Sequence, residues 1–558
     1  MKKQTLGLAI IIWVMVLGLT VCGNSSAQAA DKTLNEIKAE LRALYGENKP
    51  ITDGNYDKSL AVKCVNGTFV GKKNDGVIAY KGIPFVGKQP VGELRWKAPI
   101  DFVPDDGVYE AYYNGKSPCQ IDDRTQVAAL YVKGEDCLYL NVWRADDGEK
   151  KKPVMVWIHG GAFEYGGTVE PREEGANFVK ENPDVIFVSI GYRLGVFGFL
   201  HLSHLPDGKD YPDAQNLGIM DQMMALKWIH ENIANFGGDP DNVTIWGESA
   251  GGDSVTTLPL IEGSHKYFRK VIAQSGTPVL SRTTEQNIES TNKIMEMLGC
   301  KTVADLQKVD VKKMVEAMGS LGGMCVGPER DGKYLPLDPY EAYANGAAKD
   351  IEFLQGVNKD ELNYFMVISG GAETFVEFAR KRWAENSTQL TDEEKALVES
   401  FCKDIKGESY ETFCRLYDQI WFTAPLFRLL ENQAQAGGKS YVYYFTVESS
   451  VPLMKSGHAV ELSTVFNHPE ETYVAGRAFD ETFSKTMRKM WVQFAKTGNP
   501  SLSAEQSPDG KAHEWPLYDL ENKGVMVLDE FNIHPSKEFE LKLVDWDRCY
   551  FLTKYYCM

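Results

Sequence analysis

The sequence predicts an α/β fold with a large, mostly parallel central sheet, helices on both of its faces and helical insertions over the sheet. Strand-like and helix-like segments alternate through most of the 558 residues. Residues 154–158 and 185–190 are continuous apolar runs, which are typical of central strands covered on both faces. Residues 243–246 form a third such run, which leads through the pentapeptide GESAG at 247–251 into small residues that favour a helix.

The first 29 residues are predicted to be a signal peptide. Two lysines precede an apolar run at 6–21, which is short for a membrane span, and small residues at 27–30 suit signal peptidase. We therefore expect cleavage near Ala29 and a secreted or periplasmic protein. The minor alternative is a lipoprotein processed at Cys22, although Val21 is larger than the usual residue before such a cysteine. No other uninterrupted apolar stretch has the length of a membrane span.

Residues 30–558 are expected to form a single domain, because no linker-like segment and no repeat interrupts them. The net charge of −18 argues against a nucleic-acid partner. Of the ten cysteines one lies in the signal peptide, and the nine that remain leave at least one thiol unpaired within the chain. No cysteine or histidine spacing fits zinc, so neither a metal nor a cofactor is expected. The oligomeric state is open.

The later elements follow from the same patterns. Residues 221–233 have helical spacing and end before a turn signal at 236–240. Strands are expected at 353–357 and 441–447. Two helical regions, at about 290–318 and 391–430, are expected to form the insertions over the sheet.

The pentapeptide at 247–251 predicts a sharp strand-to-helix turn that presents Ser249 as a nucleophile. Gly247 and Gly251 flank the serine where a Cβ would collide as strand and helix pass closely. The pattern alone is weak, because a chain with 50 glycines nearly produces it by chance. Its interpretation depends on a base, an acid and an oxyanion site elsewhere in the chain.

A strand-turn-helix serine of this kind is followed in the chain first by an acid and then by a histidine. His458 is the best candidate for the base, because it follows Gly457 in a loop just beyond the strand expected at 441–447. The acid is Asp360 or Glu361, directly after the strand at 353–357, and the residues alone do not choose between them. A solvated charged turn is the alternative interpretation of that segment. The other histidines after the serine are His265, His468, His513 and His534.

The small residues at 159–163 follow the strand at 154–158 and leave backbone N–H groups free to bind a substrate oxygen. Together with the N–H of Ala250 they predict an oxyanion hole with three donors. An ordinary glycine turn is the alternative.

With these motifs in place, the chain resembles the type-B carboxylesterases, the family of the bacterial para-nitrobenzyl esterases, animal carboxylesterases and cholinesterases. The resemblance extends from about residue 62 to residue 519. The matching motifs lie at 80–85, 90–96, 135–142, 192–200, 236–240, 243–252, 356–361 and 457–462. The resemblance implies an α/β-hydrolase fold and a catalytic triad of Ser249, His458 and Glu361, which decides the acid. It also implies that Ser275 is a partner of Glu361.

By the same resemblance, Gly161, Ala162 and Ala250 donate the oxyanion N–H groups. Fuller versions of the motif have a third glycine at the position of Ala162. The para-nitrobenzyl esterases resemble this chain in having alanine instead. Cys119 and Cys137 match the first disulfide of the family. The implied activity is hydrolysis of a small-molecule carboxylic ester through an acyl-enzyme on the serine.

The substrate is less well defined. A cholinesterase needs an aromatic site for a cation, which its family places within the first disulfide loop, and residues 120–136 contain no Trp and one Tyr, Tyr131. Uncharged esters are therefore favoured over choline esters. An exported esterase that removes acetyl or feruloyl groups from polysaccharides is an alternative. A non-catalytic binding module is a weaker one, because all three residues of the triad are present.

Overall fold

The computed structural model describes residues 45–121, 131–374 and 410–537, together with the isolated residues 43, 377 and 392. The expected signal peptide, with Cys22, lies outside the described residues. The strands are β1 (Ala61–Cys64), β2 (Asn66–Val70), β3 (Lys72–Asn74), β4 (Val77–Pro84), β5 (Asp105–Glu110), β6 (Ser117–Pro118), β7 (Lys133–Gly134), β8 (Tyr139–Ala145), β9 (Lys152–Ile158), β10 (Ile186–Ile190), β11 (Gly238–Glu248), β12 (Lys270–Gln274), β13 (Glu352–Asn358), β14 (Lys439–Phe445), β15 (Val525–Leu528) and β16 (His534–Ser536). The helices are α3 (Gly175–Glu181), α4 (Gly195–Gly198), α5 (Leu217–Asn232), α6 (Ala250–Thr257), α7 (Thr284–Met297), α8 (Val303–Leu306), α9 (Val311–Ser320), α10 (Pro339–Ala344), α11 (Glu361–Ile368), α14 (Tyr410–Asp418), α15 (Ala424–Gln435), α16 (Leu462–Val465) and α17 (Glu481–Thr497).

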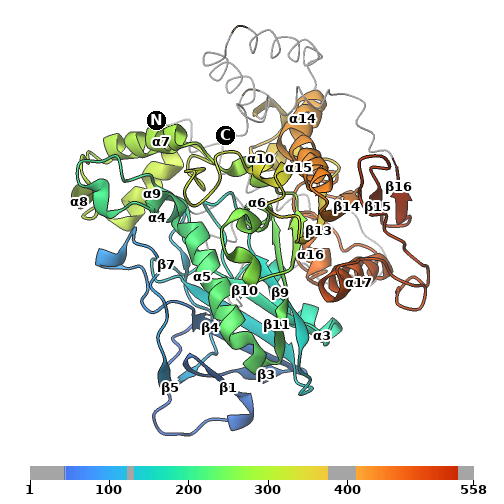
Figure 1. Ribbon diagram of the computed structural model, residues 1–558, viewed down its shortest axis with the longest axis horizontal. Coiled ribbons are helices and arrows are strands. Elements are labelled where there is room, and N and C mark those ends of the chain that lie inside the picture. The colour runs from blue at the N-terminus through green and yellow to red at the C-terminus, as the bar shows by residue number, and fades with distance from the viewer. Residues whose placement is uncertain are drawn as a thin grey trace.

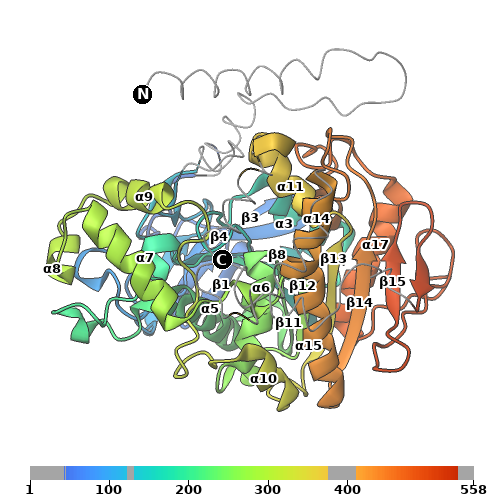
Figure 2. The same ribbon diagram turned by 90° about the horizontal axis from the view of Figure 1, so that it is seen from above.

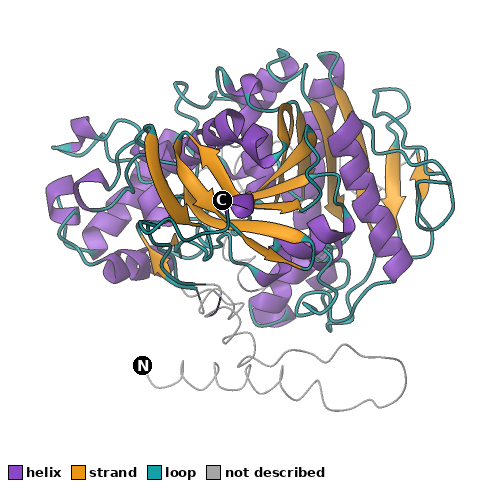
Figure 3. Ribbon diagram, turned by 90° about the horizontal axis from the view of Figure 1, so that it is seen from below, coloured by secondary structure: helices purple, strands orange, loops and turns teal. Residues whose placement is uncertain are grey.

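An 11-stranded sheet forms the centre of the described part of the molecule, with the strand order β16-β15-β14-β13-β12-β11-β9-β10-β8-β4-β3. The neighbours from β10 through β15 in this order are parallel, and both outer parts are antiparallel. In the register, Val156 of β9 pairs with Ile245 of β11 and with Val188 of β10. Figure 3 shows the strands as one twisted layer among the helices. The sheet confirms the predicted fold class.

The two faces of the sheet belong to separate apolar cores, because successive side chains of a buried strand point in opposite directions. Val154 and Val156 of β9 pack in the core that contains the buried side of α5. Met155 and Trp157 of the same strand pack in the core that contains residues of α3 and α17. Figure 1 shows α5 crossing in front of the central strands. Each central strand is thus apolar on both faces, as its continuous apolar sequence predicts.

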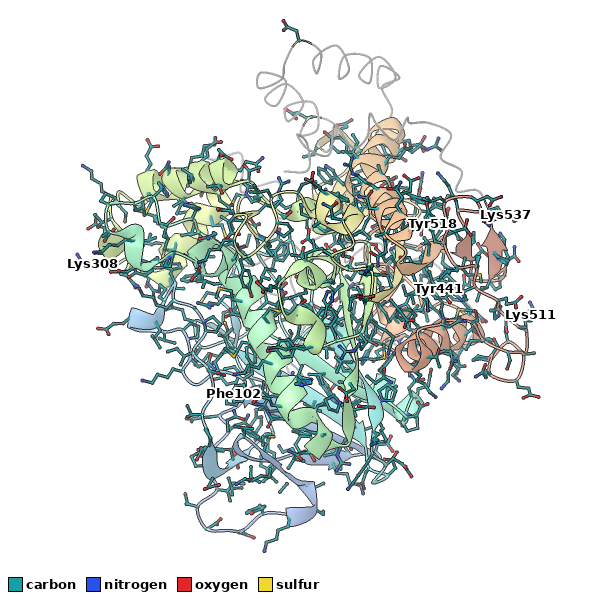
Figure 4. All side chains as sticks on the ribbon, in the orientation of Figure 1. Phe102, Lys308, Tyr441, Lys511, Tyr518 and Lys537 are labelled. Carbon is teal, nitrogen blue, oxygen red and sulfur yellow. The ribbon has the colours of Figure 1, made fainter. Side chains whose placement is uncertain are left out.

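Helical segments extend the molecule to both sides of the sheet. Figure 2 shows α7, α8 and α9 at one end, and α14 and α15 beside β13 and β14. Figure 4 places Lys308, between α8 and α9, at one end of the long axis and Lys511 and Lys537 at the other. The helical region expected at 391–430 is described only from residue 410, apart from residue 392, where α14, a π-helix (Gln419–Thr423) and α15 follow one another.

The carboxyl ends of the parallel strands lie at one edge of the sheet, and this edge determines where the chemistry can be. The loops after β9, β11, β12, β13 and β14 all begin there. Ligands of open α/β sheets bind outside this edge. None of the helices in the described ranges has the length and apolar character that crossing a membrane needs.

Candidate active site

Ser249 occupies a strained turn between β11 and α6. Its backbone angles are φ 56° and ψ −122°, which a residue with a side chain rarely adopts. The chain can turn this tightly because glycines flank the serine. A Cβ on Gly247 would lie 2.4 Å from the carbonyl carbon of Gly251, and a Cβ on Gly251 would lie 2.0 Å from Ile158 O. The side chain of the serine is therefore displayed at the carboxyl edge of the sheet.

The loop after β9 lies against this turn. A Cβ on Gly160 would lie 2.7 Å from the backbone oxygen of Glu248 and 3.2 Å from Ser249 Cβ, so a residue with a side chain would push the two segments apart. The next residues have left-handed backbones, with φ values of +104° at Gly161, 55° at Ala162 and 60° at Phe163. Ala162 and Ser249 line the same cavity. The expected oxyanion residues Gly161 and Ala162 thus belong to a loop held beside Ser249, and Ala250 is the first residue of α6.

Glu361 is the first residue of α11, three positions after the end of β13, and its side chain is fully buried. Its Oε1 accepts hydrogen bonds from Ser275 Oγ and from the backbone N–H of Asn358, both at 2.6 Å. Its Oε2 lies 2.6 Å from Nδ1 of His458. Three contacts therefore fix one carboxylate against one imidazole, and Ser275 is one of the residues that make them.

His458 lies in the loop between β14 and α16 and is 4% exposed. Its backbone N–H donates to the carbonyl of Glu361 at 3.2 Å. His458 and Glu361 are therefore joined twice, once through their backbones and once through their side chains. The other ring nitrogen, Nε2, lies 3.0 Å from Oε1 of Glu248, at an angle outside that of a hydrogen bond. Within the described part of the chain no hydrogen bond joins this nitrogen to Ser249 Oγ. Such contacts often form only when substrate is bound.

The charges around His458 determine its protonation. Burial lowers the pKa of His458, but the neighbouring carboxylates of Glu248 and Glu361 outweigh burial and hold the pKa well above its usual value. A third buried carboxyl, Glu461, accepts from Gln274 Nε2 at 2.8 Å and from Asn358 Nδ2 at 2.7 Å. Burial and the charge of Glu248 raise the pKa of Glu461 to about 7. An imidazolium among these carboxyls is thus strongly favoured.

The sequence pattern did not single out Glu461, Gln274 or Asn358. One feature of the sequence could have indicated Glu461: it is an acid between two apolar residues, three positions after His458. A carboxyl in such a segment is buried only where hydrogen-bond partners satisfy it. Asn358 connects the segments, because its amide donates to Gly457 O at 2.8 Å as well as to Glu461.

A mostly apolar cavity opens beside Ser249. The space between its walls is about 520 Å³, and this volume includes solvent at the open mouth of the cavity. Aromatic rings form one wall, and those of Phe365 and Phe422 each lie 5.1 Å from the ring of His458. The lining residues other than Ser249 and Ala162 are Ser275, Gly276, Thr277, Val279, Leu280, Met324, Phe365, Trp421 and Phe422. The reacting atoms of a bound ester would therefore lie next to an apolar surface.

The expected disulfide is not formed in the structure. Cys119 and Cys137 are both buried free thiols, and they line a second cavity together with Arg95 and Glu135. Burial, to which the nearby Glu135 adds, raises the pKa of Cys119 to about 12. The described residues include no group of three or more His, Cys, Asp or Glu side chains with the arrangement of a metal site.

Comparison with known proteins identifies the class. The model of the carboxylesterase family matches residues 58–542. Para-nitrobenzyl esterase of Bacillus subtilis is 34% identical over 85% of this chain and 96% of its own length. Mouse cholinesterase is 30% identical over 81% of this chain and 80% of its own length.

Solved structures agree. The carboxylesterase EST55 of Geobacillus stearothermophilus superposes with a TM-score of 0.73 at 34% identity, over 86% of this chain and 97% of that one. A thermophilic para-nitrobenzyl esterase gives a TM-score of 0.76 at 32% identity, over 88% of this chain and all of that one. The fold is therefore that of the α/β-hydrolases. The chain belongs to the carboxylesterase family. It is a serine carboxylic ester hydrolase, which acts on small-molecule esters.

Proposed function

We propose that the enzyme hydrolyses carboxylic esters through an acyl-enzyme on Ser249, with His458 as base and acid and Glu361 as the carboxylate that orients it. The observation that carries this proposal is the 2.6 Å contact between His458 Nδ1 and Glu361 Oε2, at the sheet edge where the strained turn displays Ser249. A carboxylate only accepts hydrogen bonds, so Nδ1 keeps its proton toward Glu361. The imidazolium must first lose the proton on Nε2 to solvent, and the lone pair of the resulting neutral ring then lies on Nε2.

In the proposed first step, Nε2 leaves Glu248, faces Ser249 Oγ and takes the hydroxyl proton while Oγ attacks the ester carbonyl carbon. The N–H groups of Gly161, Ala162 and Ala250 stabilise the negative oxygen. The alcohol then leaves with the proton returned by His458. In the second half of the reaction, water loses a proton to the same nitrogen and releases the acid.

Ser249→Ala tests this assignment. We expect the turnover of a para-nitrophenyl ester to fall by about 10⁶-fold, as removal of a triad serine does elsewhere. Ser320→Ala is the matched control, because that serine is exposed and donates to Glu316 O. Retention of substantial turnover by folded Ser249→Ala protein would contradict the proposal.

For the substrate, we propose uncharged esters with an apolar acyl or alcohol part, in preference to choline esters. The mostly apolar lining of the cavity beside Ser249 supports this choice. Acetyl or feruloyl esters of polysaccharides are the alternative. A panel that pairs para-nitrophenyl acetate, butyrate and octanoate with butyrylcholine, methyl ferulate and acetylated xylan separates these classes by kcat/KM.

We also propose that the protein is exported after cleavage near Ala29, with lipidation at Cys22 as the alternative, and that export permits a bridge between Cys119 and Cys137. The shared cavity of the two buried thiols supports the pairing. Intact mass and N-terminal sequencing of the mature protein separate cleavage from lipidation. Peptide mapping without reduction reports the disulfide, and two alkylated thiols would contradict it.

A further inference from the structure

A second serine, histidine and glutamate lie together outside the site described above. Ser203 and His201 belong to the loop after α4, and Glu329 lies in the segment between α9 and α10. Ser203 Oγ lies 2.9 Å from His201 Nε2. The opposite nitrogen, His201 Nδ1, lies 2.9 Å from Glu329 Oε2 and 3.1 Å from its Oε1. The chain thus joins hydroxyl, imidazole and carboxylate in one continuous hydrogen-bonded line.

Glu329 is held from several directions. Its side chain accepts hydrogen bonds from Thr284 Oγ1 at 2.7 Å and from Asn287 Nδ2 at 3.2 Å. Its backbone is fixed by the amide of Asn216, which accepts from the N–H at 2.8 Å and donates to the carbonyl at 3.0 Å. The carboxyl is only 1% exposed. The position of the acid is therefore set by the fold rather than by solvent.

The contacts determine the roles of the imidazole nitrogens. Because the carboxylate of Glu329 only accepts, the proton of neutral His201 lies on Nδ1, and the lone pair of Nε2 faces the hydroxyl of Ser203. His201 is 8% exposed, whereas Ser203 is exposed. A nearly buried base therefore stands directly behind a hydroxyl that solvent and solutes reach.

We propose that Ser203 is a second nucleophile, which becomes acylated by activated esters such as aryl acetates. His201 Nε2 takes the hydroxyl proton as Oγ forms a bond to the acyl carbon. The bond from that carbon to the aryl oxygen breaks, and the aryl oxide leaves with the electron pair and is protonated by His201 or by water. The product is an acyl ester on Ser203. Ser203 is exposed and lies outside the cavity beside Ser249, so we expect this site to act on reactive aryl esters and to retain the acyl group.

The proposal is tested in full-length Ser249→Ala protein incubated with para-nitrophenyl acetate, with acetylated peptides measured by mass spectrometry over time. We expect acetylation of Ser203 well above that of Ser320, an exposed serine bonded only to a backbone carbonyl. Adding His201→Gln removes the base and should slow acetylation of Ser203 by about 100-fold. Adding His204→Gln is the matched control, because His204 packs with its ring 5.5 Å from that of His201 while its Nε2 contacts Asn292 Oδ1. Acetylation of Ser203 no faster than that of Ser320 would overturn the proposal, as would equal rates with and without His201.

Folding of the His201→Gln change is checked in protein that retains Ser249, by its ester turnover. If that variant does not fold, Ser203→Cys gives a second test. Its thiol should react with iodoacetamide at neutral pH at least about tenfold faster than the thiol of Ser320→Cys, because the imidazole accepts its proton, and equal rates would overturn the proposal. The result does not depend on the proposed role of Ser249, because mass spectrometry identifies the peptide that carries the acetyl group.

Discussion

Two serine–histidine–glutamate sets lie among the residues that the structure describes, and they differ in what surrounds the serine. Ser203 has the complete hydrogen-bonded line to His201 and Glu329, yet it stands in an exposed loop. Ser249 lacks a hydrogen bond to its histidine in this structure, but it has the strained turn, the glycine loop and the apolar cavity. A hydrogen-bonded serine, histidine and glutamate can thus form outside a substrate cavity, with a buried acid and a nearly buried base behind an exposed serine. In the proposed active site, the cavity and the candidate oxyanion N–H groups come from loops at the carboxyl edge of the sheet.

The largest expected difference between the sets is in their carboxylates. Glu361→Gln should lower kcat for a para-nitrophenyl ester by about 10⁴-fold, because an amide no longer holds the imidazole in its productive tautomer. Glu329→Gln should change ester turnover by less than about twofold, because the altered contact belongs to the other set. Turnover is normalised to the folded fraction from circular dichroism. A comparable loss in both variants would show that the two sets are coupled.

The next difference concerns the loop beside Ser249. Gly161→Ala places a Cβ 2.1 Å from Tyr165 O at a φ of +104°, so the backbone must move, and with it the N–H groups that we propose as oxyanion donors. We expect kcat to fall by about 10²–10³-fold with a much smaller change in KM. Ala162→Gly, at the next residue, relieves a positive φ and should stay near the parent rate. Equal kinetics of the two variants would argue against this loop as the oxyanion site.

A smaller effect is expected on the pH dependence of the main set. Since the pKa of His458 is raised, kcat/KM should be lost as pH falls through a value above the usual histidine range. Glu248→Gln removes one carboxylate that favours the imidazolium, so the acid limb should move to lower pH. Acetylation of Ser203 is the internal reference and should keep its pH profile. If the acid limb of kcat/KM does not move in Glu248→Gln, a group other than His458 causes the loss of activity at low pH.

The smallest effect is expected for Ser203→Ala. Steady-state turnover should remain within about 1.5-fold of the parent, because sites without shared partners contribute independently. With para-nitrophenyl acetate, however, the variant should lose the slow covalent increment of one acetyl group per chain that intact mass spectrometry records. A large loss of turnover would mean that Ser203 contributes to the main reaction.

The periodicity of the sequence predicts the fold well, because each central strand is an apolar run covered on both faces. The strand expected at 353–357 lies within β13, and that expected at 441–447 overlaps β14. The choice between Asp360 and Glu361 did not follow from the residues. In the structure Asp360 Oδ2 accepts from Ser456 N at 3.4 Å while Glu361 meets His458, and the direction in which α11 leaves the strand decides this.

Contacts between distant segments account for what the sequence did not predict. His201 and Glu329 are 128 residues apart, and each alone has the pattern of an ordinary loop residue. The partners of Glu461 come from the ends of two other strands, β12 and β13. The Cys119–Cys137 bridge that the family resemblance implies is not formed in the structure, because a matching sequence motif does not determine the redox state of two thiols.

The strained backbone of Ser249 links catalysis to stability. At φ 56° and ψ −122°, glycine fits better than serine, and the conformation costs a residue with a Cβ about 1–3 kcal/mol. Ser249→Gly should therefore abolish turnover and also raise the free energy of unfolding by about 1 kcal/mol, measured by urea denaturation against Ser249→Ala, which keeps the strain. If Ser249 is the nucleophile that we propose, the most stable version of this turn is an inactive one, and selection for stability alone would remove that serine.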